Sequence, residues 1–326
     1  MNRLVLIDGN AILHRAYHAL PPLTDPEGNV INAVYGFTSM LLKIFHDLAP
    51  THIAVAFDRP APTFRKEMFK AYQAHRPKMD DELIPQVERV HEMVRAFGIP
   101  IYEMDGYEAD DIIGTICEQV HSENKENNID QTIIVTGDRD ILQLVEDDKV
   151  FVYMPTKGLS EAKLYGEKET KERMGVTPKQ IPDFKALAGD ASDNYPGVSG
   201  IGPKTAVQLL DTFGSFENLY SRIEKNERDL GDIGEGTLEK LRKDKDNAVM
   251  SHQLATIHTD VPVEITLKEI STLNTLQARE ALGKLGFKTL LKRLENSDAD
   301  KEGKTGKKEK KEPPEKKDDA DQLSLI

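Results

Sequence analysis

The chain has 326 residues, of which 38% are apolar and 30% charged, a composition typical of a globular protein with two domains of ordinary size. No apolar run reaches the roughly 18 residues that a membrane span needs. The N-terminus also lacks the apolar stretch and cleavage site of a signal peptide. The lone Cys117 cannot form an internal disulfide, so we expect a cytoplasmic protein.

The formal net charge of −13 opposes binding to a polyanion such as nucleic acid. Nine acidic residues considered below would contribute −9 of this charge, which leaves −4 for the rest of the chain. Two divalent cations held by those nine residues would bring the total close to zero. Net charge therefore excludes little for this chain.

Short runs of apolar and β-branched residues recur through the first half of the chain and predict strands at 4–7, 52–57, 99–104, 132–135 and 150–153. Helical patterns separate most of them, at 33–48, 83–97 and 110–120. Near-continuous apolar strands that alternate with helices predict an α/β fold, with a mostly parallel sheet covered by helices on both faces. We expect this domain to span residues 1–174.

From about Gly175 the strand patterns give way to short helical patterns punctuated by glycine, which predict a helical domain over 175–294. Residues 298–321 contain eight lysines, nine acids and two prolines. Such a segment buries too little apolar surface to fold, so 295–321 should be a disordered charged linker. Residues 322–326 are mostly apolar and stand apart from it.

Acidic residues follow four consecutive predicted strands at the point where each strand ends. Ligand sites in open parallel sheets form beyond the carboxyl ends of the strands, so we expect these side chains to share one edge. Two further acids near the start of the helical domain are three positions apart, a spacing that puts both on one helix face. The set is Asp8, Asp58, Glu108, Asp110, Asp111, Asp138, Asp140, Asp190 and Asp193.

At any one of these positions, an acid after a strand could equally be a helix N-cap or a turn residue. The joint pattern favours a metal site, because crowded carboxylates repel each other unless cations neutralise them. Oxygen ligands without a cluster of Cys or His select Mg²⁺, or Mn²⁺, over zinc. Two such ions about 4 Å apart can activate water and stabilise the leaving oxygen in phosphodiester hydrolysis.

Other catalytic signatures are missing from the sequence. No Ser-His-Asp or Cys-His arrangement has a recognisable local context, and no phosphate-binding loop of the GxxxxGK[ST] type occurs. We therefore expect hydrolysis without a covalent intermediate and without ATP.

Two segments are candidates for contact with DNA. The sequence GVSGIGPKTA at 197–206 predicts a glycine-rich hairpin that opens a helix and offers free backbone N–H groups to a phosphate. An ordinary tight turn between helices is the alternative. Residues 60–80 are basic with interleaved aromatics and could bind single-stranded DNA, although a solvated charged helix would have the same composition. The candidate contacts are Arg65, Tyr72, Arg76, Gly197, Gly200, Gly202, Lys204 and Thr205.

In combination, these segments resemble the 5′ nuclease family, which includes the N-terminal domain of bacterial DNA polymerase I, phage 5′ nucleases and flap endonucleases. The matching stretches are LIDGN at 6–10, VAFD at 55–58, EADD at 108–111, TGDRD at 136–140, residues 189–206 and SHQLATI at 251–257. The resemblance covers about residues 1–294.

The resemblance implies a catalytic domain over 1–174 with a mobile arch at about 60–85, and a helix-hairpin-helix DNA-binding domain over 175–294. It implies a monomeric, nucleoid-associated enzyme of DNA replication and repair that acts on 5′ flaps, nicks and RNA primers. By this resemblance the nine carboxylates are the catalytic metal ligands, and Tyr72 and Arg76 engage the region of the scissile phosphate. The hairpin resembles one that binds K⁺ through its carbonyl groups.

The sequence departs from the family at two places. The arch usually reads Tyr-Lys-x-x-Arg, but here Gln73 replaces the lysine, so Lys70 or Arg76 would have to supply the charge or the enzyme is slower. No polymerase domain follows, which indicates a free-standing nuclease. The C-terminal residues resemble the Gln-Leu-x-Leu-Phe peptide that binds the sliding clamp, with an accidental apolar end as the alternative. They are Gln322, Leu323, Leu325 and Ile326.

Two other functions remain open for this sequence. A non-catalytic DNA-junction binder would keep the fold and recruit the clamp, but it has no need for nine mutually repelling acids. A metal-dependent ribonuclease could use the same sheet, whereas the hairpin after Asp193 favours duplex DNA.

Overall fold

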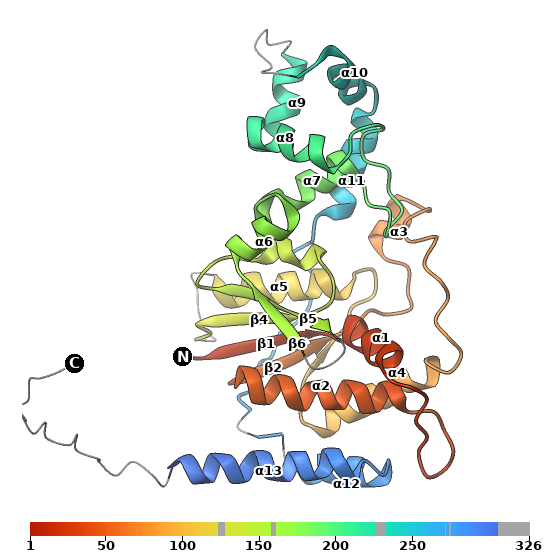
Figure 1. Ribbon diagram of the computed structural model, residues 1–326, viewed down its shortest axis with the longest axis vertical. Helices are drawn as coiled ribbons and strands as arrows, with labels where there is room; N and C mark the ends of the chain where they lie inside the picture. Colours follow the sequence, from red (N-terminus) through yellow and green to blue (C-terminus); the bar gives the residue numbers. More distant parts are fainter. Residues whose placement is uncertain (123–127, 158–160, 226–232, 271, 274, 306–326) are drawn as a thin grey trace, which may run out of the picture.

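The computed structural model describes residues 1–122, 128–157, 161–225, 233–270, 272–273 and 275–305. Its centre is a six-stranded sheet in the order β3-β2-β1-β4-β5-β6 (Figure 1). All neighbouring strands are parallel except β5 and β6. The strands are β1 (Arg3–Asp8), β2 (His52–Ala56), β3 (Ile101–Tyr102), β4 (Gln131–Val135), β5 (Val150–Lys157) and β6 (Glu161–Tyr165).

The predicted α/β class is confirmed, and five of the six strands lie where the apolar runs place them. The sequence did not predict β6, the antiparallel edge strand. Its sequence EAKLY contains no apolar run, and Leu164 is 45% exposed. An edge strand with one solvated face can be polar, so its hydrophobic pattern is weak.

The sheet is buried on both faces, because alternate residues of its central strand point into two different apolar cores. Leu4 and Leu6 face the core that α5 (Ala109–His121) completes, while Val5 and Ile7 face the core of α1, α2 and α4. Those three helices are Gly9–Ala19, Asn32–Leu48 and Ile84–Ala96. The carboxyl ends of β1, β2 and β4 consequently meet at one edge, beside the start of α5.

A helical region rises from that edge of the sheet (Figure 1). Its apolar residues, such as Leu187, Leu209 and Leu241, belong to the same continuous core as Ile112 and Leu142 beside the sheet. The shared core fixes the helical region relative to the strand ends. Its elements are α6 (Glu167–Met174), η2 (Pro178–Gln180), α7 (Ile181–Ala188), α8 (Pro203–Phe213), α9 (Phe216–Glu224), α10 (Glu235–Lys243) and α11 (Lys245–Ala255).

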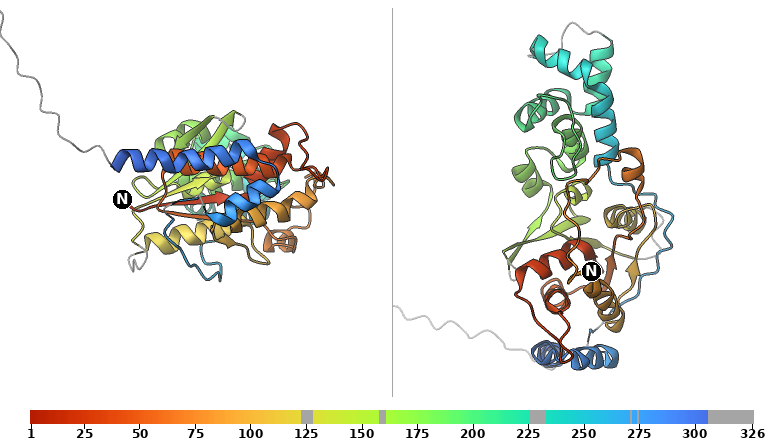
Figure 2. Two further views of the ribbon diagram at one scale, coloured as in Figure 1. Left: turned by 90° about the horizontal axis from the view of Figure 1, so that it is seen from below. Right: turned by 90° about the vertical axis from the view of Figure 1, so that its right-hand side faces the viewer.

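After α11 the chain returns past the sheet to its opposite end. The backbone N–H of Ile270 donates to the carbonyl of Thr51 beside β2. Helices α12 (Leu276–Lys284) and α13 (Lys288–Thr305) then pack against α4 and α2 (Figure 2). The predicted helical domain 175–294 is therefore divided: α7 to α11 lie beyond the carboxyl ends of the strands, whereas α12 and the start of α13 pack against α4 and α2.

Helix α13 continues to Thr305, past residue 295 where the charged composition predicts the start of a disordered linker. Lys, Glu and Ala are good helix formers, so a helix anchored through Leu290 and Leu294 can extend into such a sequence. The rest of the linker and the clamp-like peptide at 322–326 lie outside the described residues. Within the described ranges, every helix is too short or too polar to cross a lipid bilayer.

Candidate active site

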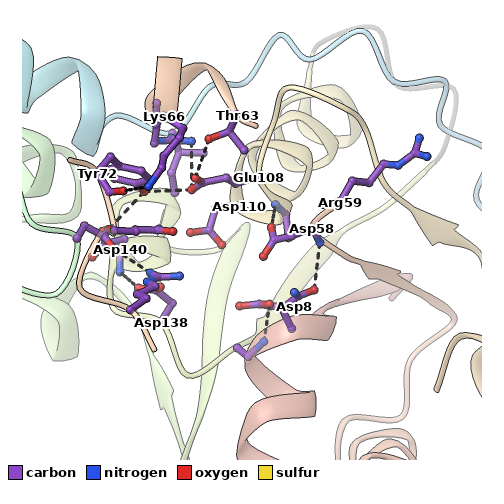
Figure 3. Close-up of a pocket in the computed structure, with 18 of the residues that line it drawn as sticks. Asp8, Asp58, Arg59, Thr63, Lys66, Tyr72, Glu108, Asp110, Asp138 and Asp140 are labelled. Atoms are coloured by element: carbon purple, nitrogen blue, oxygen red, sulfur yellow. Dashed lines mark hydrogen bonds and ion pairs between the residues drawn. The ribbon is translucent and has the colours of Figure 1, made fainter. Parts of the chain in front are cut away.

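A cavity of about 520 Å³ lies beyond the carboxyl ends of the strands, between the sheet and residues 59–76 (Figure 3). Seven of the nine predicted carboxylates line it: Asp8, Asp58, Glu108, Asp110, Asp138, Asp140 and Asp193. Figure 3 shows the carboxyl groups of Asp8, Asp58, Asp110 and Asp138 directed into the same space. The strand-end rule therefore predicted the location of most of the cluster.

Three of the predicted acids also have the capping role that the sequence left open. Asp8 is the N-cap of α1 and accepts a hydrogen bond from the N–H of Ala11 at 3.0 Å, while its second oxygen accepts from Thr136 Oγ1 at 2.6 Å. Glu108 and Asp111 form a reciprocal capping box at the start of α5. Capping and crowding are compatible, because the caps fix the carboxylates of Asp8 and Glu108 at helix N-termini beside the cavity.

The crowded carboxyl groups hold their protons unusually strongly. Burial raises the pKa of Asp8, of Glu108 and of Asp140 to about 7 in each case. Burial, followed by repulsion from Asp138 and Asp8, raises the pKa of Asp110 well above its usual range. Asp58 is exposed at the cavity, and partial desolvation of its carboxyl group by the surrounding protein raises its pKa as well. Divalent cations would relieve this repulsion, and the all-oxygen donor set suits Mg²⁺ or Mn²⁺.

A second group of carboxylates joins the sheet to the helical region. Oxygens of Asp140, Asp190 and Asp193 lie within 4.8 Å of one another, a separation that lets all three bind one cation. Asp190 does not line the main cavity. Its backbone pairs with Tyr195 in a short bridge before the hairpin. The helical region thus supplies candidate ligands to the same site.

Lys185 of α7 is a site residue that the sequence reasoning missed. Its buried ammonium donates to carboxyl oxygens of both Asp140 and Asp190. Although burial opposes the charge, the two carboxylates raise the pKa of Lys185. Burial acts to raise the pKa of Asp190, but Lys185 outweighs it and the pKa is lowered. A lysine inside the mostly apolar helix IPDFKALA was the available signal.

Two predicted roles need revision, those of Asp111 as a metal ligand and of Arg65 as a DNA contact. The Arg65 guanidinium donates to both oxygens of Asp111, at 2.7 and 2.8 Å, and the two side chains are 3% and 0% exposed. Asp111 also accepts from the backbone N–H groups of Glu108 and His258. All of its accessible lone pairs are used and it does not line the cavity, so this ion pair holds the site together from behind.

The stretch 251–258 holds the segments that carry the carboxylates. The carbonyls of Leu254 and Thr256 accept hydrogen bonds from Arg65. Gln143, which follows Asp140, donates to the carbonyl of Ala255 at 3.0 Å and accepts from the N–H of Ile257. The contacts of this stretch with Arg65 and Gln143 use its backbone groups, which side-chain patterns in the sequence do not reveal.

Residues 59–83, within the predicted arch, extend from β2 to the helical region and back to α4, and include α3 (Phe64–Met68). The Tyr72 hydroxyl donates to Glu108 at 3.2 Å, and Arg76 pairs with Asp193 at 2.8 Å. The N–H of Gln73, whose φ is 53°, donates to the carbonyl of Asp193. The structure thus brings Tyr72 and Arg76 to the carboxylates, with Gln73 between them.

The glycine-rich hairpin precedes α8 as predicted. Gly197 has a φ of 61°, and a Cβ there would lie 2.3 Å from the backbone nitrogen of Gly189, so only glycine fits. Gly202 is the N-cap of α8 and offers no side chain, which leaves the first backbone amides, including those of Lys204 and Thr205, to other partners. Lys240 of α10 donates to the carbonyl of Gly200 at 3.1 Å. The exposed helix start suits a phosphate.

Comparison with known sequences identifies the group to which this chain is related. Residues 3–175 match the profile of the 5′-3′ exonuclease N-terminal resolvase-like domain, and residues 176–278 match that of the 5′-3′ exonuclease C-terminal SAM fold. This chain belongs to the 5′-3′ exonuclease family.

Among curated relatives of this family member, DNA polymerase I of Bacillus subtilis is 42% identical over 302 residues, which cover 92% of this chain and 33% of that protein. DNA polymerase I of Geobacillus stearothermophilus is 45% identical over 269 residues, covering 82% and 29%. The chain therefore spans about a third of the length of the relatives it matches.

Solved structures show that the exonuclease fold is shared more widely. A T5 5′-exonuclease with bound zinc ions has a TM-score of 0.63 at 18% identity, covering 92% of this chain and 99% of that one. The catalytic core of Rad2 in complex with a DNA substrate has a TM-score of 0.56 at 17% identity, covering 87% and 88%. At these identities the comparison concerns the fold.

Proposed function

We propose that this chain is a metal-dependent 5′-3′ exonuclease and 5′-flap endonuclease that hydrolyses DNA, including RNA-primed ends, in replication and repair. One observation carries the proposal: carboxylates from four strand ends and from the helical region converge on one open cavity. Their raised pKa values indicate a site that needs cations. The family supports the reaction class.

The carboxylates divide into two candidate sets of metal ligands. Asp8, Asp58, Asp110 and Asp138, with Glu108 beside them, would hold one Mg²⁺, while Asp140, Asp190 and Asp193 would hold the other. When bound, two such ions activate water and neutralise charge on the phosphate. Water adds to phosphorus and one ester P–O bond breaks, which gives a phosphomonoester and a hydroxyl group.

The chain's own residues position the substrate around these carboxylates. Arg76 and Tyr72 lie against Asp193 and Glu108 and would contact the strand that enters beside residues 59–76. The hairpin with Gly200 and the exposed start of α8 would bind the duplex backbone, with K⁺ as a further ligand of the hairpin. In this assignment Arg65 and Asp111 act only by positioning α5.

The proposed partners are DNA with 5′ flaps or nicks and, through the C-terminal peptide at 322–326, the sliding clamp. T5 flap endonuclease in complex with DNA and metal ions, and the Rad2 core with its DNA substrate, share the fold. Clamp binding rests on the peptide sequence and its tether alone. Deletion of 322–326 should abolish binding to the clamp and leave cleavage of free oligonucleotides unchanged.

A direct test uses labelled 5′-flap, nicked and single-stranded oligonucleotides incubated with Mg²⁺ or with EDTA, beside an Asp138→Ala variant. We expect cleavage of the flap and nicked substrates by the wild type with Mg²⁺ only. Tight binding of flaps without cleavage would instead identify a junction-binding protein. Preferential cleavage of RNA would identify a ribonuclease, and equal cleavage in EDTA would contradict metal dependence.

A further inference from the structure

The basic side chains around the active-site cavity differ in whether a carboxylate already neutralises them. Arg65 pairs with Asp111 and is buried, and Arg76 pairs with Asp193. Burial lowers the pKa of His14, so that this imidazole is neutral at pH 7. The two arginines would have to leave their carboxylate partners before they could bind a substrate phosphate. His14 carries no positive charge to offer.

Arg59 also lines the cavity, but it pairs with acids outside it. Its guanidinium lies 3.1 Å from Asp105 and 4.0 Å from Glu103. In Figure 3 its side chain points away from the carboxyl groups of Asp58 and Asp110. Its charge is therefore used on the outer surface.

Lys66 is the exception among the described basic residues that line the cavity, because it has no carboxylate partner. Its ammonium donates at 2.6 Å to a neutral acceptor, the main-chain carbonyl of Tyr72, at the edge where Glu108 and Thr63 face the cavity (Figure 3). The neighbouring Arg65 is held on both sides, so the backbone that carries Lys66 is fixed.

We propose that Lys66 binds the phosphodiester that enters the cavity and stabilises the negative charge that grows on it during hydrolysis. The inference rests on the proposed nuclease function. A phosphate oxygen carries negative charge and attracts the ammonium more strongly than a neutral carbonyl does, so the substrate displaces the Tyr72 carbonyl from Lys66. Because the lysine is already held at the cavity, little reorganisation is needed.

Position 73, where the side chain is a neutral glutamine, offers the best test of the proposed role of Lys66. Gln73 lines the same cavity as Lys66, and its backbone is bound to Asp193. A lysine at position 73 would therefore place an ammonium in the cavity from the other side of Tyr72. Lys70, which the sequence offered as a source of the missing charge, does not line the cavity, so that expectation is corrected and Lys70 serves as a matched control of equal charge.

The experiment measures single-turnover cleavage of a labelled 5′-flap oligonucleotide with enzyme in excess and Mg²⁺ present. We expect Lys66→Met to lower the rate about 100-fold, the lower end of the range for loss of one donor that stabilises the transition state, and Lys70→Met to change it less than about twofold. Adding Gln73→Lys to Lys66→Met should restore most of the rate. That rescue separates charge from a structural role, because it cannot rebuild the bond between Lys66 and the Tyr72 carbonyl.

Binding in EDTA supplies a second readout that needs no catalysis. The slope of log affinity against log salt concentration should fall by about 0.7 to 0.9 in Lys66→Met, as for loss of one phosphate contact. The proposal is overturned if Lys66→Met keeps the wild-type rate, if Lys70→Met loses as much, or if Gln73→Lys gives no rescue. If the wild type itself does not cleave, the proposed function fails, and the salt slopes of the two variants still decide whether Lys66 contacts phosphate.

Discussion

Replacement of Arg65 by methionine tests whether the buried ion pair behind the active site holds the two parts of the molecule together. Arg65→Met leaves the fully buried Asp111 with two backbone N–H donors and deprives the carbonyls of Leu254 and Thr256 of theirs. Breaking a buried pair in this way costs about 3–5 kcal/mol. Two backbone donors to Asp111 remain, so we expect the free energy of unfolding to fall by about 3 kcal/mol, the lower end of this range.

The assay is urea unfolding in EDTA at neutral pH, followed by circular dichroism. Arg59→Met is the control, because Arg59 is 44% exposed and its pairs lie at the surface, so its loss should be below about 1 kcal/mol. A double-mutant cycle with Asp111→Asn should show strong coupling between the two side chains. If Arg65→Met were as stable as Arg59→Met but bound DNA more weakly, Arg65 would be a DNA contact after all.

Further predictions concern the carboxylates, Lys185 and the hairpin. Asp138→Asn should lower the rate of Mg²⁺-dependent cleavage at least about 100-fold, while the circular dichroism spectrum stays that of the wild type. Retained activity would remove Asp138 from the proposed ligand set. Lys185→Met should lower the melting temperature of the metal-free protein, and Mg²⁺ should raise it more than in wild type, because Asp140 is left unpaired; an equal Mg²⁺ response would count against this. Gly197→Ala should weaken binding to duplex DNA about 10-fold or more, since the added Cβ would lie 2.3 Å from the Gly189 nitrogen at a φ of 61° that is strained for alanine; unchanged affinity would show that the hairpin does not need this conformation. In the folded protein the pKa values of Asp8, Glu108 and Asp140 are about 7, so these carboxyl groups keep their protons below that pH. In the unfolded chain they ionise at their usual, lower pKa values. The stability they contribute is complete at acidic pH and lost as the pH rises through about 7. Urea unfolding of the metal-free protein at about pH 5 and pH 8 checks this, and greater stability at pH 8 would refute it.

The sequence alone determined the sheet and where its ligands would lie. The apolar runs predicted five strands, and acids at their ends predicted the cavity, because parallel strands deliver their carboxyl ends to a common edge. These are local signals: burial on two faces requires an uninterrupted apolar strand, and Asp8 reaches the edge because it is the last residue of β1. The polar edge strand β6 gave no such signal.

Tertiary structure decided which of the nearby charges face the cavity. Asp110 and Asp111 are adjacent in sequence, yet one points into the cavity and the other is buried against Arg65. Helix periodicity turns neighbouring residues about 100° apart, but which direction is open depends on the stretch 251–258, far away in the chain. The same holds for Lys185, whose place between Asp140 and Asp190 exists only once the helical region packs on the sheet.

The nine acids of the sequence therefore correspond to eight around a shared candidate metal site and one, Asp111, that supports it. Sequence spacing fixes where a carboxylate leaves the backbone, and this was enough to locate the site. Whether that carboxylate meets a cation from solvent or an arginine from the protein depends on long-range packing, since a buried charge takes whichever partner the folded chain brings within reach.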